Sequence, residues 1–407
     1  MEISLLLSLS WRNIWRNHRR TTITIVAVTV GVWSMIVLAA IMNAWAQSAF
    51  DATVKTLVGH GQIHQKDYLR NPAVQHRFAL DNAALKRLLN SNQVAAWSTR
   101  VRVSAIVQSE RKARPVTLVG IVPDTEKKLS FIGNAVHKGH YFNNDNEDGV
   151  LLGRKMVKRL KTGLGKRVVL TTEGSDGGIA ERGFRIVGIF DAEQDQTETQ
   201  FAFITQRRAQ SLLHIGNDIS EISFLMHDVK QLDPFLQRLH QVAPGLDIVS
   251  WSQLNPFTKA LLEVSDGTIL LWTAIMFILV AFGIINTLLM AVYERMHEFG
   301  LLQALGMLPR RILSLVLLES LFLIGIGALL GFVTGIATVL TFHNGLDMGV
   351  LAKGAMMIGA GRILYPEINV PQAIYIVLFV WLMGTITSIY PAYRASRKVP
   401  VAIINRN

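Results

Sequence analysis

Four long apolar runs alternate with polar segments along the chain. The runs cover 21–46, 269–292, 312–340 and 371–390. Each can cross a hydrocarbon core, which takes about 20 apolar residues in a helix. Between the first and second runs lies a polar insert, 47–268. The pattern predicts an α-helical membrane protein with four transmembrane helices and a large extracytoplasmic α+β domain between helices 1 and 2.

The insert supplies the α+β assignment. Its strand-like runs are rich in β-branched residues and bounded by Gly, Pro and Asp; they cover 62–64, 100–108, 116–122, 168–172, 184–190 and 201–204. Helix candidates lie at 81–91, 154–160, 205–213 and 229–241. Because an insert of this length can hold two subdomains, we expect one part built from both of its ends and an inner part near 110–200.

Basic residues gather beside the apolar runs on one side only. Segments 1–20, 293–311 and 391–407 together hold 11 basic and 3 acidic residues, whereas the bases of 341–370 are Lys353 and Arg362. Cytoplasmic ends of membrane helices carry such an excess. We therefore expect both termini and 293–311 in the cytoplasm, with the insert and the short 341–370 loop on the periplasmic side of a bacterial inner membrane.

The first 20 residues carry tryptophans among arginines. Trp11 and Trp15 alternate with Arg12, Arg16 and Arg19, which is typical of an amphipathic helix in the membrane interface. A cytosolic helix without membrane contact is the alternative. Arg394, Arg397, Lys398 and Arg406 are expected to hold the tail inside after Pro391 ends the fourth span.

Composition narrows the chemistry. Half of the residues are hydrophobic, 17% are charged, and the formal net charge is +12. The basic excess lies beside membrane runs rather than on a folded domain, so we expect no nucleic-acid partner. The chain has no cysteine, which excludes thiol chemistry. Its histidines do not follow a metalloprotease spacing and it has no GxSxG motif, so no catalytic or metal-binding residue is expected.

The segment 293–311 connects the second and third runs. Its sequence ERMHEFGLLQALGMLPRR places Phe299, Leu302 and Leu305 at helical spacing. Gly306 is expected to stop the helix and Pro309 to begin the next one. A short amphipathic helix joined to a span at each end can act as a lever.

The third run contains two notable features. Glu319 is its one acid, near the inner end of the run and within reach of Arg310 or Arg311. A side chain that snorkels to the interface or forms an ion pair is favoured over a functional role, although ionisable groups inside membranes are often functional. Gly327, Gly331 and Gly335 form two overlapping GxxxG steps, which let helices approach closely. Either a sliding contact or static packing would use them.

The motifs resemble those of one family. The segment above is similar to the ExxxExGxxxAxG signature of the MacB/FtsX-type permease domain, a group that includes the lipoprotein-releasing permeases. The tail YPAYRASRKVPVAIINR resembles the closing segment of that domain, and SWRNIWRNHRRTTITIVAVTVGV its first helix and span. The insert also resembles the corresponding domain of the family, notably in the segments LVGIVPDTE, GVLLGRKMVKRLK and FRIVGIFDAE.

The resemblance implies a type VII ABC transporter, in which two permease chains, identical or paralogous, join two copies of a separate ATPase subunit. ATP and Mg²⁺ would be bound by that partner, and this chain would hold no cofactor. The segment 293–311 would be the coupling helix that docks on the ATPase, through Glu294, Arg295, Glu298, Phe299, Gly300, Leu305 and Gly306.

Such machines typically do mechanical work on the far side of the membrane. The favoured cargo is a lipoprotein or other lipidated molecule, with lipid reaching the chain between the first two spans near Val37, Ile41, Trp45, Val264 and Leu271. A periplasmic chaperone or adaptor would be a further partner. The alternatives are a mechanotransmission subunit of an efflux or export system and an FtsX-like regulator of a cell-wall hydrolase.

Overall fold

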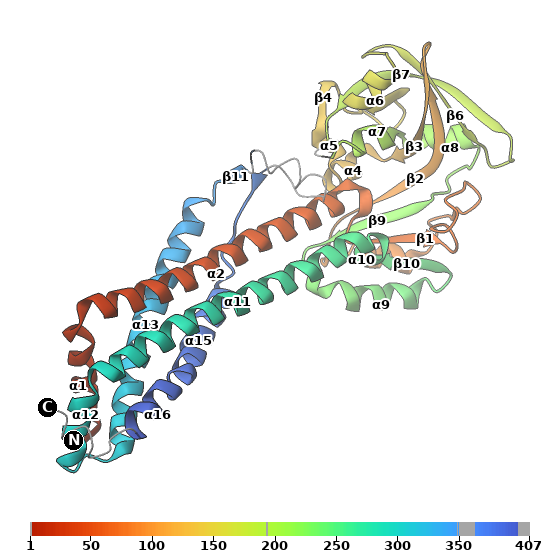
Figure 1. Cartoon of the computed structure of the whole chain (residues 1–407). Helices are drawn as coiled ribbons and strands as arrows, with labels where there is room; N and C mark the ends of the chain where they lie inside the picture. Colours follow the sequence, from red (N-terminus) through yellow and green to blue (C-terminus); the bar gives the residue numbers. More distant parts are fainter. Residues whose placement is uncertain (1, 193, 348, 350–362, 398–407) are drawn as a thin grey trace. The chain divides into compact units, whose positions relative to one another are not determined.

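The computed structural model describes residues 2–192, 194–347, 349 and 363–397. The chain forms two compact units. One gathers the segments before residue 47, from 261 to 349 and from 363 onward, and the other is built from 47–260. Figure 1 labels the helices and strands of both units, and each unit has its own hydrophobic core.

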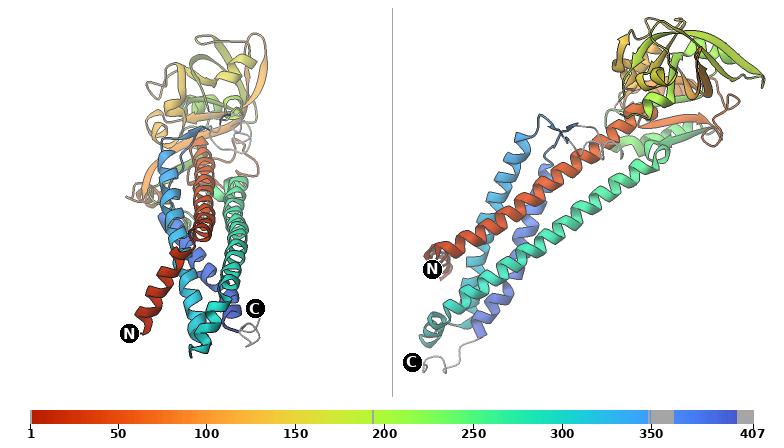
Figure 2. Two further views of the ribbon diagram at one scale, coloured as in Figure 1. Left: turned by 60° about the vertical axis from the view of Figure 1, so that its left-hand side comes forward. Right: turned by 45° about the horizontal axis from the view of Figure 1, so that its top comes forward.

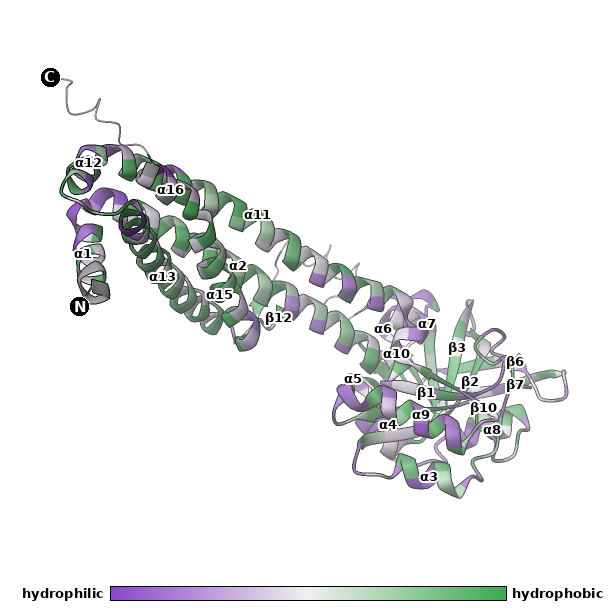
Figure 3. Cartoon of the chain, turned by 90° about the horizontal axis from the view of Figure 1, so that it is seen from below, coloured by the Kyte–Doolittle hydropathy of each residue, from purple (hydrophilic) through white to green (hydrophobic). Residues whose placement is uncertain are grey.

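The first unit is helical. In its described part, four helices are long and apolar enough to cross a membrane. Figure 2 shows α2, α11, α13 and α15 running alongside one another, and Figure 3 shows that they are mostly hydrophobic. Val28, Ile284, Ile324 and Val380, one from each, meet in a shared core. The helices are α1 (Glu2–Arg16), α2 (His18–Thr53), α11 (Pro256–Glu294), α12 (Met296–Ala304), α13 (Pro309–Thr341), α15 (Val370–Thr387) and α16 (Ile389–Arg397).

Helix bounds differ from the apolar runs at both ends of the first run. The break after the N-terminal helix falls at Asn17 rather than after Arg20, and α2 continues past Ala46 to Thr53. Helix α11 likewise begins at Pro256, before the apolar run opens at Ile269. Helix formation thus extends beyond the hydrophobic segment, because polar residues such as Gln and Lys also favour helices.

Pro391 does not end the fourth helix, which corrects the sequence expectation. Helix α15 ends at Thr387, and α16 resumes at Ile389 and continues through Pro391 to Arg397. A proline in the first turn removes no intrahelical hydrogen bond, because the amides there have no partner in any helix. Lys353, Arg362, Lys398 and Arg406 lie outside the described residues. The loop before α15 contributes the strands β11 (Leu346–Asp347) and β12 (Ile363–Leu364).

The second unit is an α+β domain. Its strands form a sheet in the order β10-β1-β9-β2-β3-β8-β5-β7-β4, and β6 pairs with β2 and β7. The pairs β3–β8 and β5–β7 are parallel and the others antiparallel. The strands are β1 (Gly61–Gln65), β2 (Val94–Gln108), β3 (Ala113–Ile121), β4 (Val136–Gly139), β5 (Gly149–Gly153), β6 (Arg167–Glu173), β7 (Ile179–Phe190), β8 (Phe201–Thr205), β9 (Glu221–Met226) and β10 (Leu246–Ser250).

Short helices cover this sheet and connect its strands. They are α3 (Ala83–Leu89), α4 (Pro123–Leu129), α5 (Ile132–Ala135), α6 (Arg154–Arg159), α7 (Thr197–Gln200), α8 (Gln206–Leu213), α9 (Leu232–Val242) and α10 (Trp251–Leu254), with a π turn η1 (Val54–Val58) and a 3-10 turn η2 (Val229–Gln231).

The domain has separate cores at its two ends. Ile63, Leu85, Phe224 and Phe235 belong to a core built from both ends of the insert. Two inner clusters fill the remainder of the domain. One contains Val74 and residues between Val101 and Ile215, and the other is centred on Phe190 and Phe203. Because β2 pairs with β9 on one side and β3 on the other, a single sheet joins these parts.

Candidate functional site

Helix α12 is held by burial of one aromatic side chain. Phe299 is 1% exposed and packs in a cluster with Val292, Ile312 and Ala392, from α11, α13 and α16. Gly306 has φ +93, the left-handed conformation that glycine adopts readily after a helix. Pro309 then opens α13. The lever segment is therefore a short helix fixed at both ends.

A chain of alternating charges connects α12 to α1, α2 and α13. Arg16 on α1 contacts Glu298 at 2.7 Å, and Arg295 contacts Glu298 at 3.2 Å and Glu319 at 3.1 Å. Arg20 on α2 then contacts Glu319 at 3.3 Å and Glu294 at 3.5 Å. We call these six residues the ion chain: Arg16, Glu298, Arg295, Glu319, Arg20 and Glu294.

Glu319 is ion-paired, but not with the expected partners. The expectation of Arg310 or Arg311 was wrong; Arg20 and Arg295 hold it instead. At a rise of about 1.5 Å per residue, Arg310 lies about 13 Å away along the helix, whereas Arg295 comes from the segment before α12. The Glu319 side chain is 4% exposed, so the ion chain has a buried middle.

The outer end of the ion chain is open to water. The side chains of Arg16 and Glu298 are 54% and 46% exposed. Burial acts to raise the pKa of Glu298, but hydrogen bonds from Arg16 and Arg295 outweigh it, and the pKa lies below its usual value. Glu298 is therefore ionised at neutral pH. The sequence analysis missed Arg16 and Arg20, although their spacing of four matches that of Glu294 and Glu298.

Exposed leucines lie on the last turn of α12 and in the segment after it. Leu305 was expected at helical spacing with Phe299, but the helix ends at Ala304 and the Leu305 side chain points outward, 77% exposed. Leu301 and Leu308 are each 58% exposed, and Arg310 beside them is exposed. We call Leu301, Leu305 and Leu308 the leucine tip. Large exposed apolar groups in a patch mark an interaction surface.

The three glycines of α13 allow close packing against α2. A methyl group at Gly331 would lie 2.7 Å from the carbonyl oxygen of Thr29, and one at Gly327 would lie 2.7 Å from Val28 Cβ. Gly335 faces Ile36 in the same way. Thr29 Oγ1 donates to the Gly327 carbonyl oxygen at 3.1 Å. The GxxxG steps are thus helix-packing positions, and whether the contact slides stays a prediction.

The five positions expected near a lipid path lie on two helices. Val37, Ile41 and Trp45 are half-buried on α2, while Val264 and Leu271 on α11 are each 62% exposed. Ser265, next to Val264, donates to the Met42 carbonyl oxygen at 3.4 Å. In this part of α11, Ser265 therefore faces α2, whereas Val264 and Leu271 are uncovered.

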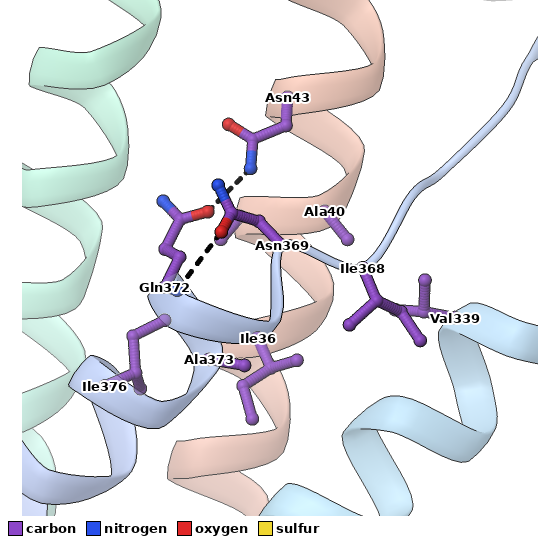
Figure 4. A pocket seen from close by; sticks show the side chains of 10 residues that line it. Ile36, Ala40, Asn43, Val339, Ile368, Asn369, Gln372, Ala373 and Ile376 are labelled. Atoms are coloured by element: carbon purple, nitrogen blue, oxygen red, sulfur yellow. Dashed lines mark hydrogen bonds between the residues drawn. The ribbon is translucent and has the colours of Figure 1, made fainter.

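A small hollow lies on another side of α2, between α2, α13 and α15 (Figure 4). Asn43 Nδ2 donates to Gln372 Oε1 at 2.6 Å, and Asn369 caps α15. Ile36, Ala373 and Ile376 form its apolar wall. The hollow combines amides and alkyl groups. The hydrogen bond between the Asn43 and Gln372 amides links α2 to α15, which are far apart in sequence.

Two buried histidines of the domain have structural partners. His60 Nδ1 accepts from the Met226 amide at 2.9 Å, and His64 Nε2 contacts Gln62 Oε1 at 2.9 Å. Within the described residues, no group of three His, Asp or Glu side chains could hold a metal ion.

Two family models match the chain. That of the MacB-like periplasmic core domain covers residues 21–242, and that of the FtsX-like permease C-terminal region covers residues 270–400. The chain is 21% identical to the lipoprotein-releasing system transmembrane protein LolC of Xylella fastidiosa, over 93% of this chain and 91% of the relative. It is 22% identical to LolE of Haemophilus influenzae over 98% of both.

A third relative is longer than this chain. The macrolide export ATP-binding/permease protein MacB of Nitrobacter winogradskyi is 25% identical over 66% of this chain and 41% of the relative. Four helices that are long and apolar enough to cross a membrane, a large α+β domain and the two matched models together place the chain in the ABC transporter permease class. With both models matched, the chain belongs to the MacB/FtsX-type permease family.

Proposed function

We propose that this permease subunit converts ATP hydrolysis by a separate ATPase into work on lipidated cargo outside the inner membrane. Helix α12 would be the docking element, with α1, α12 and both termini in the cytoplasm. Exposed Arg12, Arg19 and Arg310 at the same ends of the helices support this orientation. Two copies of the ATPase subunit would join the complex, and they would bind the ATP and Mg²⁺.

The leucine tip is the observation that carries the docking proposal. Leu305 is 77% exposed at a turn expected to face water, where an apolar side chain gains free energy by being covered. Glu294 and Glu298, by contrast, already pair within the chain. The tip would therefore bury itself in the ATPase, while the acidic residues would hold α12 in place for docking.

Co-purification tests this proposal directly. The full-length chain, isolated in mild detergent from its native host, should retain a small ATPase. Leu305→Asp should release that ATPase, and Leu164→Asp, at a leucine 45% exposed in the α+β domain, should not. Absence of any ATPase from the wild-type preparation, or its retention by Leu305→Asp, would contradict docking through the tip.

A second permease chain would cover α11. The most apolar part of this helix is 22% buried, against 50% for α13. Leu279, Phe282 and Met290 are each at least 60% exposed, and Asn286 is exposed among them. An amide facing hydrocarbon is costly and favours a hydrogen-bonding partner on another helix. A stripe of this kind therefore fits a partner helix better than lipid alone.

Disulfide formation can detect that partner, because the chain has no cysteine. Phe282→Cys should give a crosslinked pair of copies on oxidation in membranes. Leu329→Cys on α13, at a position 61% exposed, is the matched control. Crosslinking of Leu329→Cys but not Phe282→Cys would contradict the proposed surface, and a crosslink to a different permease chain would identify a paralogous partner.

Lipidated cargo is favoured because the LolC and LolE relatives match over nearly their whole length. The uncovered residues Val264 and Leu271 could contact an acyl chain in the membrane beside α2. A photoreactive residue at Trp45 or Leu271 should trap a lipidated molecule, whereas one at Ile179, 83% exposed in the α+β domain, should trap none. Recovery of a periplasmic adaptor without lipidated cargo would favour export, as in the name of the MacB relative.

A further inference from the structure

The last turn of α2 leaves helical geometry where the chain enters the α+β domain. Helix α2 ends at Thr53, and η1 follows with non-helical angles at Thr56 and Leu57. Leu57 has φ +86 and a side chain that is 2% exposed. A bulky residue with positive φ costs about 1 kcal/mol or more and persists only where its surroundings enforce it.

Carbonyl groups of this turn, which in an ordinary helix end face water, are bonded to the domain. The Leu57 oxygen accepts from Arg100 Nη1 at 2.5 Å and from Gln62 Nε2 at 2.9 Å. Gln62 also donates to the Val58 oxygen at 2.9 Å, as does Ser223 Oγ at 3.3 Å. Side chains of β1, β2 and β9 therefore together hold two successive carbonyls: Gln62 bonds to both, Arg100 to that of Leu57 and Ser223 to that of Val58.

Arg100 is the central group of this grip. Its side chain is fully buried, and it forms a two-pronged pair with Glu126, with Nη2–Oε1 at 2.8 Å and Nε–Oε2 at 3.0 Å. Nη1 contacts Glu221 Oε1 at 2.9 Å as well as the Leu57 oxygen. Burial opposes the charge of Arg100, but Glu126 and Glu221 outweigh it and raise its pKa. The negative end of the α2 dipole adds to the same balance.

This arrangement differs from ordinary core packing in one mechanical respect. Apolar contacts are non-directional, so by themselves they define the orientation of a helix less sharply than directed bonds do. Hydrogen bonds from a planar guanidinium have fixed directions. Hydrogen bonds to the carbonyls therefore fix the angle between the end of α2 and the sheet. Without these bonds, the strained turn at Thr56 and Leu57 would be free to act as a hinge.

We propose that Arg100 is a positioning residue that sets and holds the angle at which the last two turns of α2, from Gln47 to Thr53, join the sheet of the same unit, so that displacement of this helix end reaches β2 and β9. The inference rests on the proposed function only in assuming that α2 moves. The angle itself is a property of the α+β domain, and it can be measured with no ATPase present.

Electron paramagnetic resonance can measure this angle in the full chain, because the absence of cysteine permits clean labelling. Spin labels at Gln47→Cys on α2 and Ser104→Cys on β2, both exposed positions, report the distance between helix and strand in lipid nanodiscs. Arg100→Lys keeps a cation but cannot bond both carboxylates and the Leu57 oxygen in the same geometry. The distance distribution should broaden in Arg100→Lys and stay narrow in the wild type.

Two variants make the test decisive. Arg77→Lys is the matched control, because Arg77 pairs with Asp218 at 3.0 Å in the same domain without contacting the turn; it should leave the distribution narrow. Gln62→Leu removes another donor without changing charge and should broaden it, which covers a failure of Arg100→Lys to fold. A folded Arg100→Lys of reduced thermal stability with a wild-type distribution would show that Arg100 only stabilises the domain.

Discussion

The two ends of α2 are each served by arginine–glutamate clusters, and the two clusters differ in their access to water. At the first end, the ion chain passes from Glu319, 4% exposed, to Arg16, 54% exposed. At the second, Arg100, Glu126 and Glu221 are at most 1% exposed. We call the ion chain the open cluster, and Arg100, Glu126 and Glu221 the closed cluster at the closed end of α2. Ion pairs in water exchange partners at little cost, whereas a buried charge that loses its partner is strongly destabilising.

The two ends of α2 therefore differ in how freely their ion pairs can rearrange. The open cluster lies where α12 would meet a partner, and its pairs can rearrange as α12 moves. The closed cluster holds a strained turn in one geometry. One helix thus begins in an adjustable contact and ends in a fixed one, which suits a part that receives movement at one end and delivers it at the other.

The largest expected effect is on the closed cluster. Arg100→Met leaves Glu126 and Glu221 buried without their cation, and should lower the free energy of unfolding of the domain by about 3–5 kcal/mol. Hydrogen exchange of β2 and β9 in the full chain measures this. Arg16→Met is the matched change in the open cluster and should cost less than about 1 kcal/mol. Equal losses in the two variants would remove the distinction.

An intermediate effect is expected at the buried middle of the ion chain. Glu319→Gln leaves Arg20 and Arg295 without a shared carboxylate, which should cost about 1–3 kcal/mol and loosen α1. Thermal unfolding in detergent and tryptic cleavage after Arg12 or Arg16 report both effects. Glu294→Gln serves as the control, because Arg20 loses one partner in this variant but keeps its ion pair with Glu319. If the two variants are cleaved at the same rate, Glu319 does not hold α1.

Residue patterns predicted most of this arrangement, but not its contacts. The four apolar runs and six strands followed from local periodicity. Four strands were missed. β5 and β9 are almost wholly buried and so lack the alternation that marks a half-exposed strand, although β8 is buried throughout and was predicted. The other two are β4, in which no residue is fully buried, and β10, in which only the last three residues are buried. Glu319 was recognised as unusual, yet its partners lie 299 and 24 residues away. Such pairings depend on helix packing, and one chain's sequence carries no direct signal of it.

Acid should weaken the closed end first. Burial lowers the pKa of His64 below its ordinary 6.5, against the opposing effect of Glu221; Arg102, Asp247 and the Tyr68 ring also face it. The unfolded chain therefore takes up a proton that the folded domain refuses, so stability falls as pH drops below 6.5. His64→Gln should reduce this dependence, as hydrogen exchange at several pH values would show; burial also lowers the pKa of His60, which accounts for the remainder. The exposed His227→Gln should leave it unchanged; a flat wild-type profile would contradict the assignment.

A second fall should follow at lower pH. Burial acts to raise the pKa of Glu221, but Arg100 and Arg102 outweigh it and hold the pKa below its ordinary 4.5. Its contribution is thus complete above 4.5 and is lost as pH falls through the folded-state value.

The smallest effect is also the one that separates the two ends most cleanly. Arg16 and Glu298 are about half exposed, so a double-mutant cycle with Arg16→Met and Glu298→Gln should give a coupling of only about 0.2–1 kcal/mol. The screening length falls from about 10 Å at 0.1 M salt to about 3 Å at 1 M, which is close to the 2.7 Å of this contact, so the coupling should shrink as ionic strength rises toward about 1 M. The Arg100–Glu126 pair excludes water, so hydrogen exchange of β2 should not respond to the same salt series. An Arg16–Glu298 coupling that survives high salt would mean that this contact is as closed as the other, and α12 would then be held rigidly to α1 instead of being free to move against it.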